Sequence, residues 1–132
     1  MPVYCGHVYC LHLPIAGKDK LLVPAFVHPD NDRVRFFVIN SKLTDYQARK
    51  PELLNHAIPI LQAKNAGFLA YDSWLVCHEL VGGYTAAQID AIKGCYRGSL
   101  DNGTLTIART LIQGSRLYSE RDKQLFLSQW PA

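Results

Sequence analysis

The stretch His56–Leu80, HAIPILQAKNAGFLAYDSWLVCHEL, decides the fold because it holds two β-prone runs and the break between them. The first run, residues 57–61, is short and apolar, and the second, residues 73–77, is rich in bulky residues that favour strands. Lys64-Asn65-Ala66-Gly67 separates them, and Asn and Gly adopt positive φ at little cost. The stretch therefore predicts a β-hairpin with a tight turn at residues 64–67.

Three further strands are expected before this hairpin. Residues 3–13 form a nearly continuous β-prone run, and residues 21–28 form a second one. The turn residues 29–32 then lead into residues 33–40, RVRFFVIN, as a third strand. Pro24 has no N–H to donate, so its part of the second strand should be an edge or a bulge. The pattern predicts antiparallel pairing.

Helical signals are clearest in the last third of the chain. Residues 41–55 are polar and should form a loop with one helical turn. Thr85 can cap another short helical turn through Gln88, and an extended segment is the alternative, since propensity does not decide between them. Asp101 can cap a helix from Asn102 to about Tyr118. The expected buried face of that helix consists of Leu105, Ala108, Leu111, Ile112 and Ser115.

The fold class that follows is α+β and mostly β, a small curled sheet of antiparallel strands with a C-terminal helix. A chain of 132 residues, 48% of them hydrophobic, is expected to form one domain over residues 1–132. Residues 119–132 would be a C-terminal extension, with room for a short second helix.

Composition limits the function only broadly. A net charge of +3 permits a nucleic-acid partner without arguing strongly for one. The first residues carry neither a basic head nor a long apolar run, so we expect no signal peptide, no membrane span and a cytoplasmic location. The four cysteines are then expected as reduced thiols.

Four short motifs follow one another along the chain: Gly6-His7-Val8-Tyr9, Val38-Ile39-Asn40-Ser41, Gly67 to Ser73, and Trp74 to Cys77. Their order, with a Pro-containing strand after the first and a closing helix at the end, resembles the MazF/PemK toxin family over residues 3–118. The resemblance implies an SH3-like barrel, a homodimer and metal-independent cleavage of single-stranded RNA without a cofactor. It also implies an antitoxin protein as partner.

Two arginines that the family uses are replaced here. Val23 precedes Pro24, where the family commonly has arginine, and Val76-Cys77-His78 matches the Arg-Cys-Asp run of one branch. The family's Ser or Thr at a strand end is matched by Asn40-Ser41, so the resemblance gives that role in the site to Ser41.

Cleavage by a 2′-hydroxyl requires a base, positive charge for the phosphorane and an acid for the leaving oxygen. His78 is the candidate acid or base because imidazole side chains ordinarily titrate near neutral pH. Ser41, beside Asn40, would donate to a phosphate oxygen. The RNA-binding candidates are the basic residues that remain: Lys18, Lys20, Arg33, Arg35 and Lys42.

The missing arginines leave a second hypothesis open, a non-catalytic module on the same barrel that binds protein or nucleic acid. The aromatic residues Tyr4, Tyr9, Tyr71 and Trp74 are expected as core or dimer contacts rather than as platforms for bases. No metal site is predicted, because strand alternation divides Cys5, His7, Cys10 and His12 between two faces.

Overall fold

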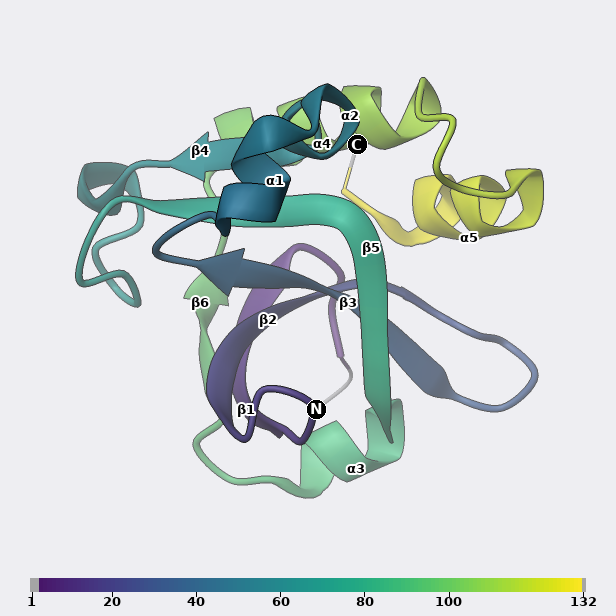
Figure 1. Cartoon of the computed structure of the whole chain (residues 1–132). Helices are drawn as coiled ribbons and strands as arrows, with labels where there is room; N and C mark the ends of the chain where they lie inside the picture. Colours follow the sequence, from purple (N-terminus) through teal and green to yellow (C-terminus); the bar gives the residue numbers. More distant parts are fainter. Residues whose placement is uncertain (1–2, 132) are drawn as a thin grey trace.

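The computed structural model describes residues 3–131, and within them six strands form one antiparallel sheet in the order β4-β5-β3-β2-β1-β6. The sheet is curled, with the long β5 bending sharply partway along its length (Figure 1). The strands are β1 His7–Leu13, β2 Lys18–Val27, β3 Arg33–Asn40, β4 Ala57–Ile60, β5 Ser73–Thr85 and β6 Tyr96–Ser99. The expected mostly-β α+β class and antiparallel pairing are confirmed.

Helices lie between and after the strands, and four of them begin at a residue whose side chain caps the first turn. They are α1 Asp45–Arg49, α2 Pro51–Leu54, the 3₁₀ helix η1 Gln62–Lys64, α3 Ala86–Ala91, α4 Asn102–Gln113 and α5 Glu120–Gln129. The capping residues are Thr44, Thr85, Asp101 and Ser119. The expected cap at Asp101 is thus confirmed, and of the two alternatives after Thr85 the helical one holds. None of the helices in residues 3–131 is long and apolar enough to cross a bilayer.

The core has two parts, one on each face of the sheet, because successive strand residues point to opposite faces. Helices α4 and α5 cover one face, and α3 packs on the other (Figure 1). The cluster under α4 and α5 includes Val23, Phe37, Leu75, Ala108 and Phe126. The cluster under α3 includes Leu11, Leu22, Phe36 and Ile89. Burial on both faces fixes the register of the strands.

Helix α5 belongs to this core. Phe126 and Trp130 are 1% and 3% exposed and stack with ring centroids 4.9 Å apart. The side chain of Gln129 accepts a hydrogen bond from the N–H of Val27 at 2.7 Å and donates one to its carbonyl at 2.9 Å. The part of the expected extension that the structure describes, residues 119–131, therefore packs as an integral layer.

The hairpin is present, but its predicted turn is wrong. Strands β4 and β5 pair antiparallel with Ala57 opposite Val76, and residues 61–72 connect them through η1. Asn65 has φ −135°, so it does not form a positive-φ turn. Its buried side chain instead donates to the Leu61 carbonyl and to Asp101 Oδ1, and it accepts from the Asp101 N–H. Asn65, which suggested a turn, instead links the connection between β4 and β5 to the capping residue of α4.

Other boundaries differ for local reasons. Strand β5 runs on to Thr85 instead of ending near residue 77, since β3 pairs with it along its whole length. Pro24 is buried in the middle of the sheet at a shift of the β2–β3 register, so the bulge alternative holds and the edge alternative does not. Helix α4 stops at Gly114, and residues 41–55 form two short helices in place of one turn.

Candidate functional site

A cleft of about 280 Å³ lies where β2 begins and β3 ends, against the connection between β4 and β5. The ladder between β2 and β3 starts with Leu21 opposite Ile39, while β2 already pairs with β1 from Lys18 onward. The first residues of β2 therefore extend beyond the end of β3 and form one wall. The lining residues are Lys18, Asp19, Lys20, Leu21, Ile39, Ser41, Phe68, Leu69, Ala70, Tyr71 and Ser73. We call this the β2 cleft.

Lys18, Asp19 and Lys20 border the β2 cleft along β2. The Lys20 ammonium donates a hydrogen bond to Asn40 Oδ1, which ties the end of β3 to β2. Burial and, secondarily, the charge of Lys18 lower the pKa of Lys20. The carboxylate of Asp19 also lies on the cleft and is 3.5 Å from His12 Nδ1. In the ladder Lys18 and Lys20 pair with Leu13 and Leu11, so their side chains leave β2 on the face opposite to Leu21 and border the cleft at its rim.

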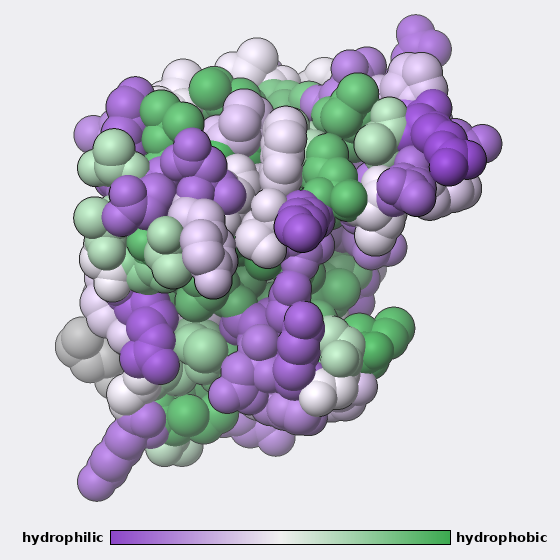
Figure 2. Space-filling model, turned by 60° about the vertical axis from the view of Figure 1, so that its left-hand side comes forward, coloured by the Kyte–Doolittle hydropathy of each residue, from purple (hydrophilic) through white to green (hydrophobic). Residues whose placement is uncertain are grey.

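The opposite wall carries aromatic rings and hydroxyls. Tyr71 is 68% exposed, so of the two expected roles the core contact is wrong, and the dimer contact stays a prediction. The Ser73 hydroxyl donates to the Tyr71 carbonyl at 3.0 Å, which braces the entrance to β5. Phe68 packs close to Gly98 of β6, where an added Cβ would lie 3.3 Å from the ring. Figure 2 shows hydrophilic and hydrophobic side chains interleaved on the side that it brings forward.

Three predicted residues thus line the β2 cleft: Lys18, Lys20 and Ser41. Asn40 does not line it, but its side chain accepts a hydrogen bond from Lys20. Lys42 follows Ser41 directly and is exposed. The structure brings these parts together from β2 and the end of β3.

The two arginines of β3 lie elsewhere. Arg33 stands opposite Thr85 at the other end of β3, which places it roughly 24 Å along the strand from Asn40. Arg35 donates from Nη2 to the Leu80 carbonyl at 3.3 Å and so satisfies the backbone where β5 bends. The predicted RNA-binding set is therefore divided between two ends of one strand.

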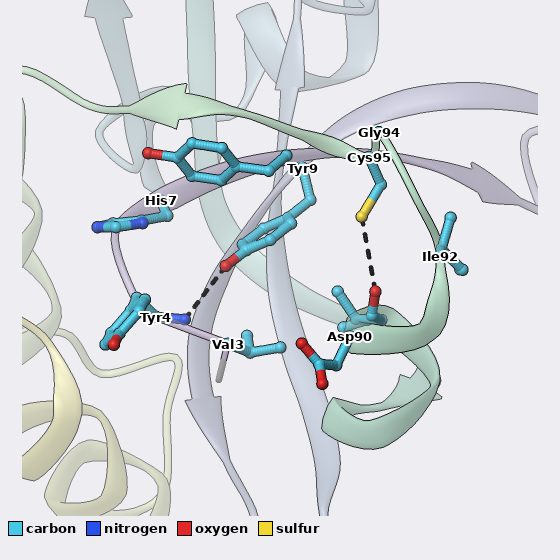
Figure 3. Close-up of a pocket in the computed structure, with 10 residues that line it drawn as sticks. Val3, Tyr4, His7, Tyr9, Asp90, Ile92, Gly94 and Cys95 are labelled. Carbon is cyan, nitrogen blue, oxygen red and sulfur yellow. Dashed lines mark hydrogen bonds between the residues drawn. The ribbon is translucent and has the colours of Figure 1, made fainter. Parts of the chain in front are cut away.

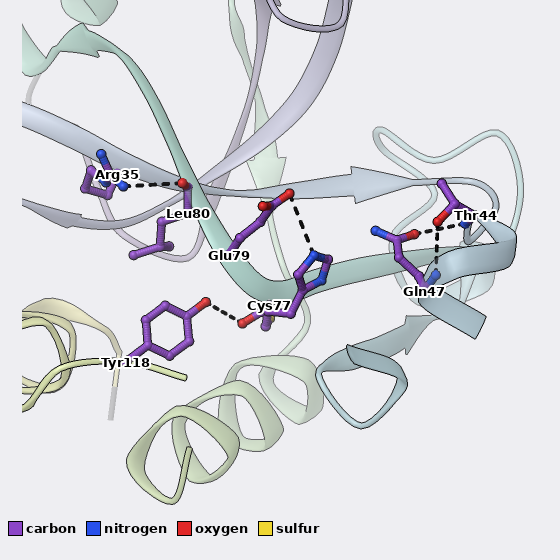
Figure 4. A network of polar contacts seen from close by, with 8 residues as sticks. Arg35, Thr44, Gln47, Cys77, Glu79, Leu80 and Tyr118 are labelled. Carbon is purple, nitrogen blue, oxygen red and sulfur yellow. Dashed lines mark hydrogen bonds and ion pairs between the residues drawn. The ribbon is translucent and has the colours of Figure 1, made fainter. Parts of the chain in front are cut away.

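His78 does not line the β2 cleft. Trp74 of β5 pairs with Asn40, and His78 lies four residues further on, roughly 13 Å along the strand. Its Nε2 is 3.7 Å from Glu79 Oε1, and its Nδ1 is buried without a hydrogen-bond partner in the described chain. Figure 4 shows Glu79 at the bend of β5, with Tyr118 donating to the Cys77 carbonyl nearby. The predicted convergence of His78 with Ser41 is not found.

A different serine and histidine do meet, in the core. His56 Nδ1 lies 2.8 Å from the Glu52 carbonyl and must donate to it, so in the neutral ring Nε2 accepts from the Ser115 hydroxyl at 2.7 Å. His56 and Ser115 are only 7% and 4% exposed, so no substrate reaches the pair. It joins α2 to the end of α4 and is structural.

Comparison with known proteins gives no identification. Neither the known protein-family models nor the curated proteins match this chain. Within residues 3–131, no three side chains of His, Cys, Asp or Glu gather to hold a metal ion. The residues that line the β2 cleft are therefore the main evidence for a function.

Sequence reasoning missed the wall formed by Phe68, Tyr71 and Ser73. Their motif was used for the resemblance, but Tyr71 was expected as a core or dimer contact. The available signal was the polar surroundings of Tyr71, with Asp72 and Ser73 after it, which favours an exposed ring.

Proposed function

We propose that this chain binds single-stranded RNA through the β2 cleft, on an SH3-like barrel. The observation that carries the proposal is the gathering of Lys18, Lys20 and Ser41 opposite the exposed ring of Tyr71. Ammonium and hydroxyl groups bind phosphate oxygens, and an exposed aromatic ring stacks on an unpaired base. Lys18 and Lys20 border the cleft along β2, and Tyr71 borders it from the connection between β4 and β5.

Binding is favoured over cleavage because the β2 cleft lacks the candidate acid or base. His78 lies along β5, outside the set of lining residues. Cleavage by Ser41 and the lysines alone would leave the 2′-hydroxyl without an imidazole to accept its proton. The non-catalytic hypothesis therefore has the better support, while toxin-type endoribonuclease activity, an antitoxin partner and a homodimer stay predictions.

The test is the salt dependence of RNA binding. Each phosphate contact that is lost should make the slope of log K against log salt shallower by about 0.7 for single strands. We expect Lys18→Ala/Lys20→Ala to reduce this slope by about 1.4 and to weaken binding of a short uridine-rich RNA. Arg33→Ala/Arg121→Ala removes the same charge at exposed positions away from the cleft and should leave the slope nearly unchanged.

The same samples separate the two hypotheses. RNA recovered intact after incubation in EDTA supports a binding module, and shortened RNA supports the endoribonuclease. Equal effects of the two double variants would show that RNA responds only to net charge and would reject the β2 cleft as the site. Binding that is insensitive to salt would reject phosphate recognition altogether.

A further inference from the structure

A second pocket, of about 320 Å³, lies where β1 begins and where α3 leads into β6. Figure 3 shows Tyr4, His7 and Tyr9 on one side of it, with Asp90, Ile92 and Cys95 on the other. Its volume is at the lower end of the range of small-molecule sites, so it suits a compact group. It shares no lining residue with the β2 cleft.

Four aromatic rings form a continuous and curved wall. The centroids of Tyr4 and His7 are 5.1 Å apart, those of His7 and Tyr96 are 5.5 Å apart, and those of Tyr96 and Tyr9 are 5.7 Å apart. Successive planes are tilted by 41°, 47° and 65°. Because no two neighbouring rings are parallel, the wall does not form a flat slot for a planar base. Curved aromatic walls instead suit a rounded group.

Contacts within the chain hold this wall in place. Tyr9 is 6% exposed, and its hydroxyl accepts a hydrogen bond from the Tyr4 N–H at 3.2 Å. This contact fixes the segment that carries Tyr4 and His7 against β1. Tyr4 and Tyr96 remain 49% and 51% exposed, so their rings are accessible from solvent. A ligand therefore meets rings that require little ordering, which favours binding.

The charges around the pocket favour a cation. No lysine or arginine lines it, and Asp90 is the one carboxylate among its lining residues in the described chain. Burial lowers the pKa of His7, which favours the uncharged imidazole. The faces of tyrosine rings are electron-rich and attract cations, and quaternary ammonium groups are bound in aromatic cages for this reason.

We propose that the pocket formed by Tyr4, His7, Tyr9 and Tyr96 binds a methylated ammonium group. Two sources share this chemistry, a choline-type small molecule and the trimethylated lysine of a partner protein. The proposal is independent of RNA binding, because it depends on different residues and on the opposite sign of charge. If the β2 cleft does not bind RNA, the proposal for this pocket is unaffected.

The first test compares two molecules of nearly the same shape. Choline and 3,3-dimethylbutan-1-ol differ in the charge of their central atom, so an apolar hollow would bind both alike. NMR titration of the full chain should show choline binding at least about tenfold more tightly, with shifts confined to residues around the pocket. An equal concentration of sodium chloride controls for ionic strength.

Variants then identify the rings as the cause. Tyr96→Leu keeps an apolar side chain but removes the π face and should weaken choline binding about tenfold, whereas Tyr96→Phe keeps the face and should bind nearly as well as the wild type. Tyr71→Leu changes an exposed tyrosine of the β2 cleft and should not change choline binding.

Binding of peptides identifies the source of the methylated ammonium group. A peptide with trimethyl-lysine that binds more tightly than choline, while its unmethylated form does not, identifies a protein side chain; tighter binding of choline identifies a small amine. Either result supports the proposal. It is overturned if the neutral alcohol binds as well as choline, if Tyr96→Leu binds like Tyr96→Phe, or if neither choline nor the methylated peptide binds.

Discussion

Asp101 joins two parts of the chain with one carboxylate. Its oxygens accept hydrogen bonds from the Thr104 N–H at 3.1 Å, the Thr104 hydroxyl at 2.7 Å and the Asn65 amide at 3.0 Å. Burial raises the pKa of Asp101, but the hydrogen bonds lower it more, so the net pKa is below its ordinary value of 3.8. Folding therefore gains stability from Asp101 above the ordinary pKa, and this gain is lost as the pH falls through the lower pKa of the folded state.

We expect Asp101→Ala to lower the free energy of unfolding by about 1–2 kcal/mol at pH 7, since it removes the cap of α4. The difference from the wild type should narrow as the pH falls below about 4, because the wild-type carboxylate then becomes protonated. Urea unfolding at several pH values measures this. Asp45→Ala, at an exposed position of α1, is the control and should change little. A difference that stays constant with pH would contradict the role given to the charge.

The four thiols should differ sharply in reactivity. Burial raises the pKa of Cys5 to about 12 and raises the pKa values of Cys77 and Cys95. Cys10 is the only one of the four that is partly exposed. A thiol reagent at pH 8 should therefore modify Cys10 first in the folded protein and all four cysteines in denaturant. Cys10→Ser should abolish the fast phase, and fast modification of Cys5 or Cys77 would show that the core opens readily.

Elements with a strong local sequence pattern were predicted correctly, whereas features that depend on pairing with a distant segment were not. Strand β3 has the predicted bounds, because hydrophobic alternation between a turn and a polar segment is a local pattern. Strand β6 was missed, since Tyr96-Arg97-Gly98-Ser99 has no strand pattern of its own and is extended only because it pairs with β1. Asn65 was misread for a similar reason, as its partner Asp101 is distant in the sequence.

Helix α5 should prove essential to stability. Phe126 is buried between Phe37 and Trp130, so Phe126→Ala should lower the free energy of unfolding by about 3–5 kcal/mol. Gln129→Ala should cost only about 0.5–1.5 kcal/mol, because the two hydrogen bonds to Val27 are exposed and water can replace the lost partner. Chemical denaturation measures both changes.

The matched control for α5 is Gln124→Ala, at an exposed position of the same helix. It should change the stability by less than about 0.5 kcal/mol. If Phe126→Ala were equally mild, residues 119–131 would contribute little to the stability of the core.

At the scale of the whole molecule, the β2 cleft depends on how the sheet curls. Its walls come from residues 18–21, 39–41 and 68–73, and only the fold brings these segments together. The sequence supplied Lys18, Lys20 and Ser41 as candidates from residue chemistry and a resemblance. It could not show that His78 lies further along β5, because that depends on the pairing of Asn40 with Trp74.

Photo-cross-linking tests most directly whether single-stranded RNA lies in the β2 cleft. RNA that contains 4-thiouridine is bound to the wild-type chain and irradiated, and the attached peptide is identified by mass spectrometry. We predict attachment within residues 68–73, with Tyr71 as the main site, and its loss in Lys18→Ala/Lys20→Ala. Attachment around Arg33, Arg35 and His78, unchanged in that variant, would contradict the claim.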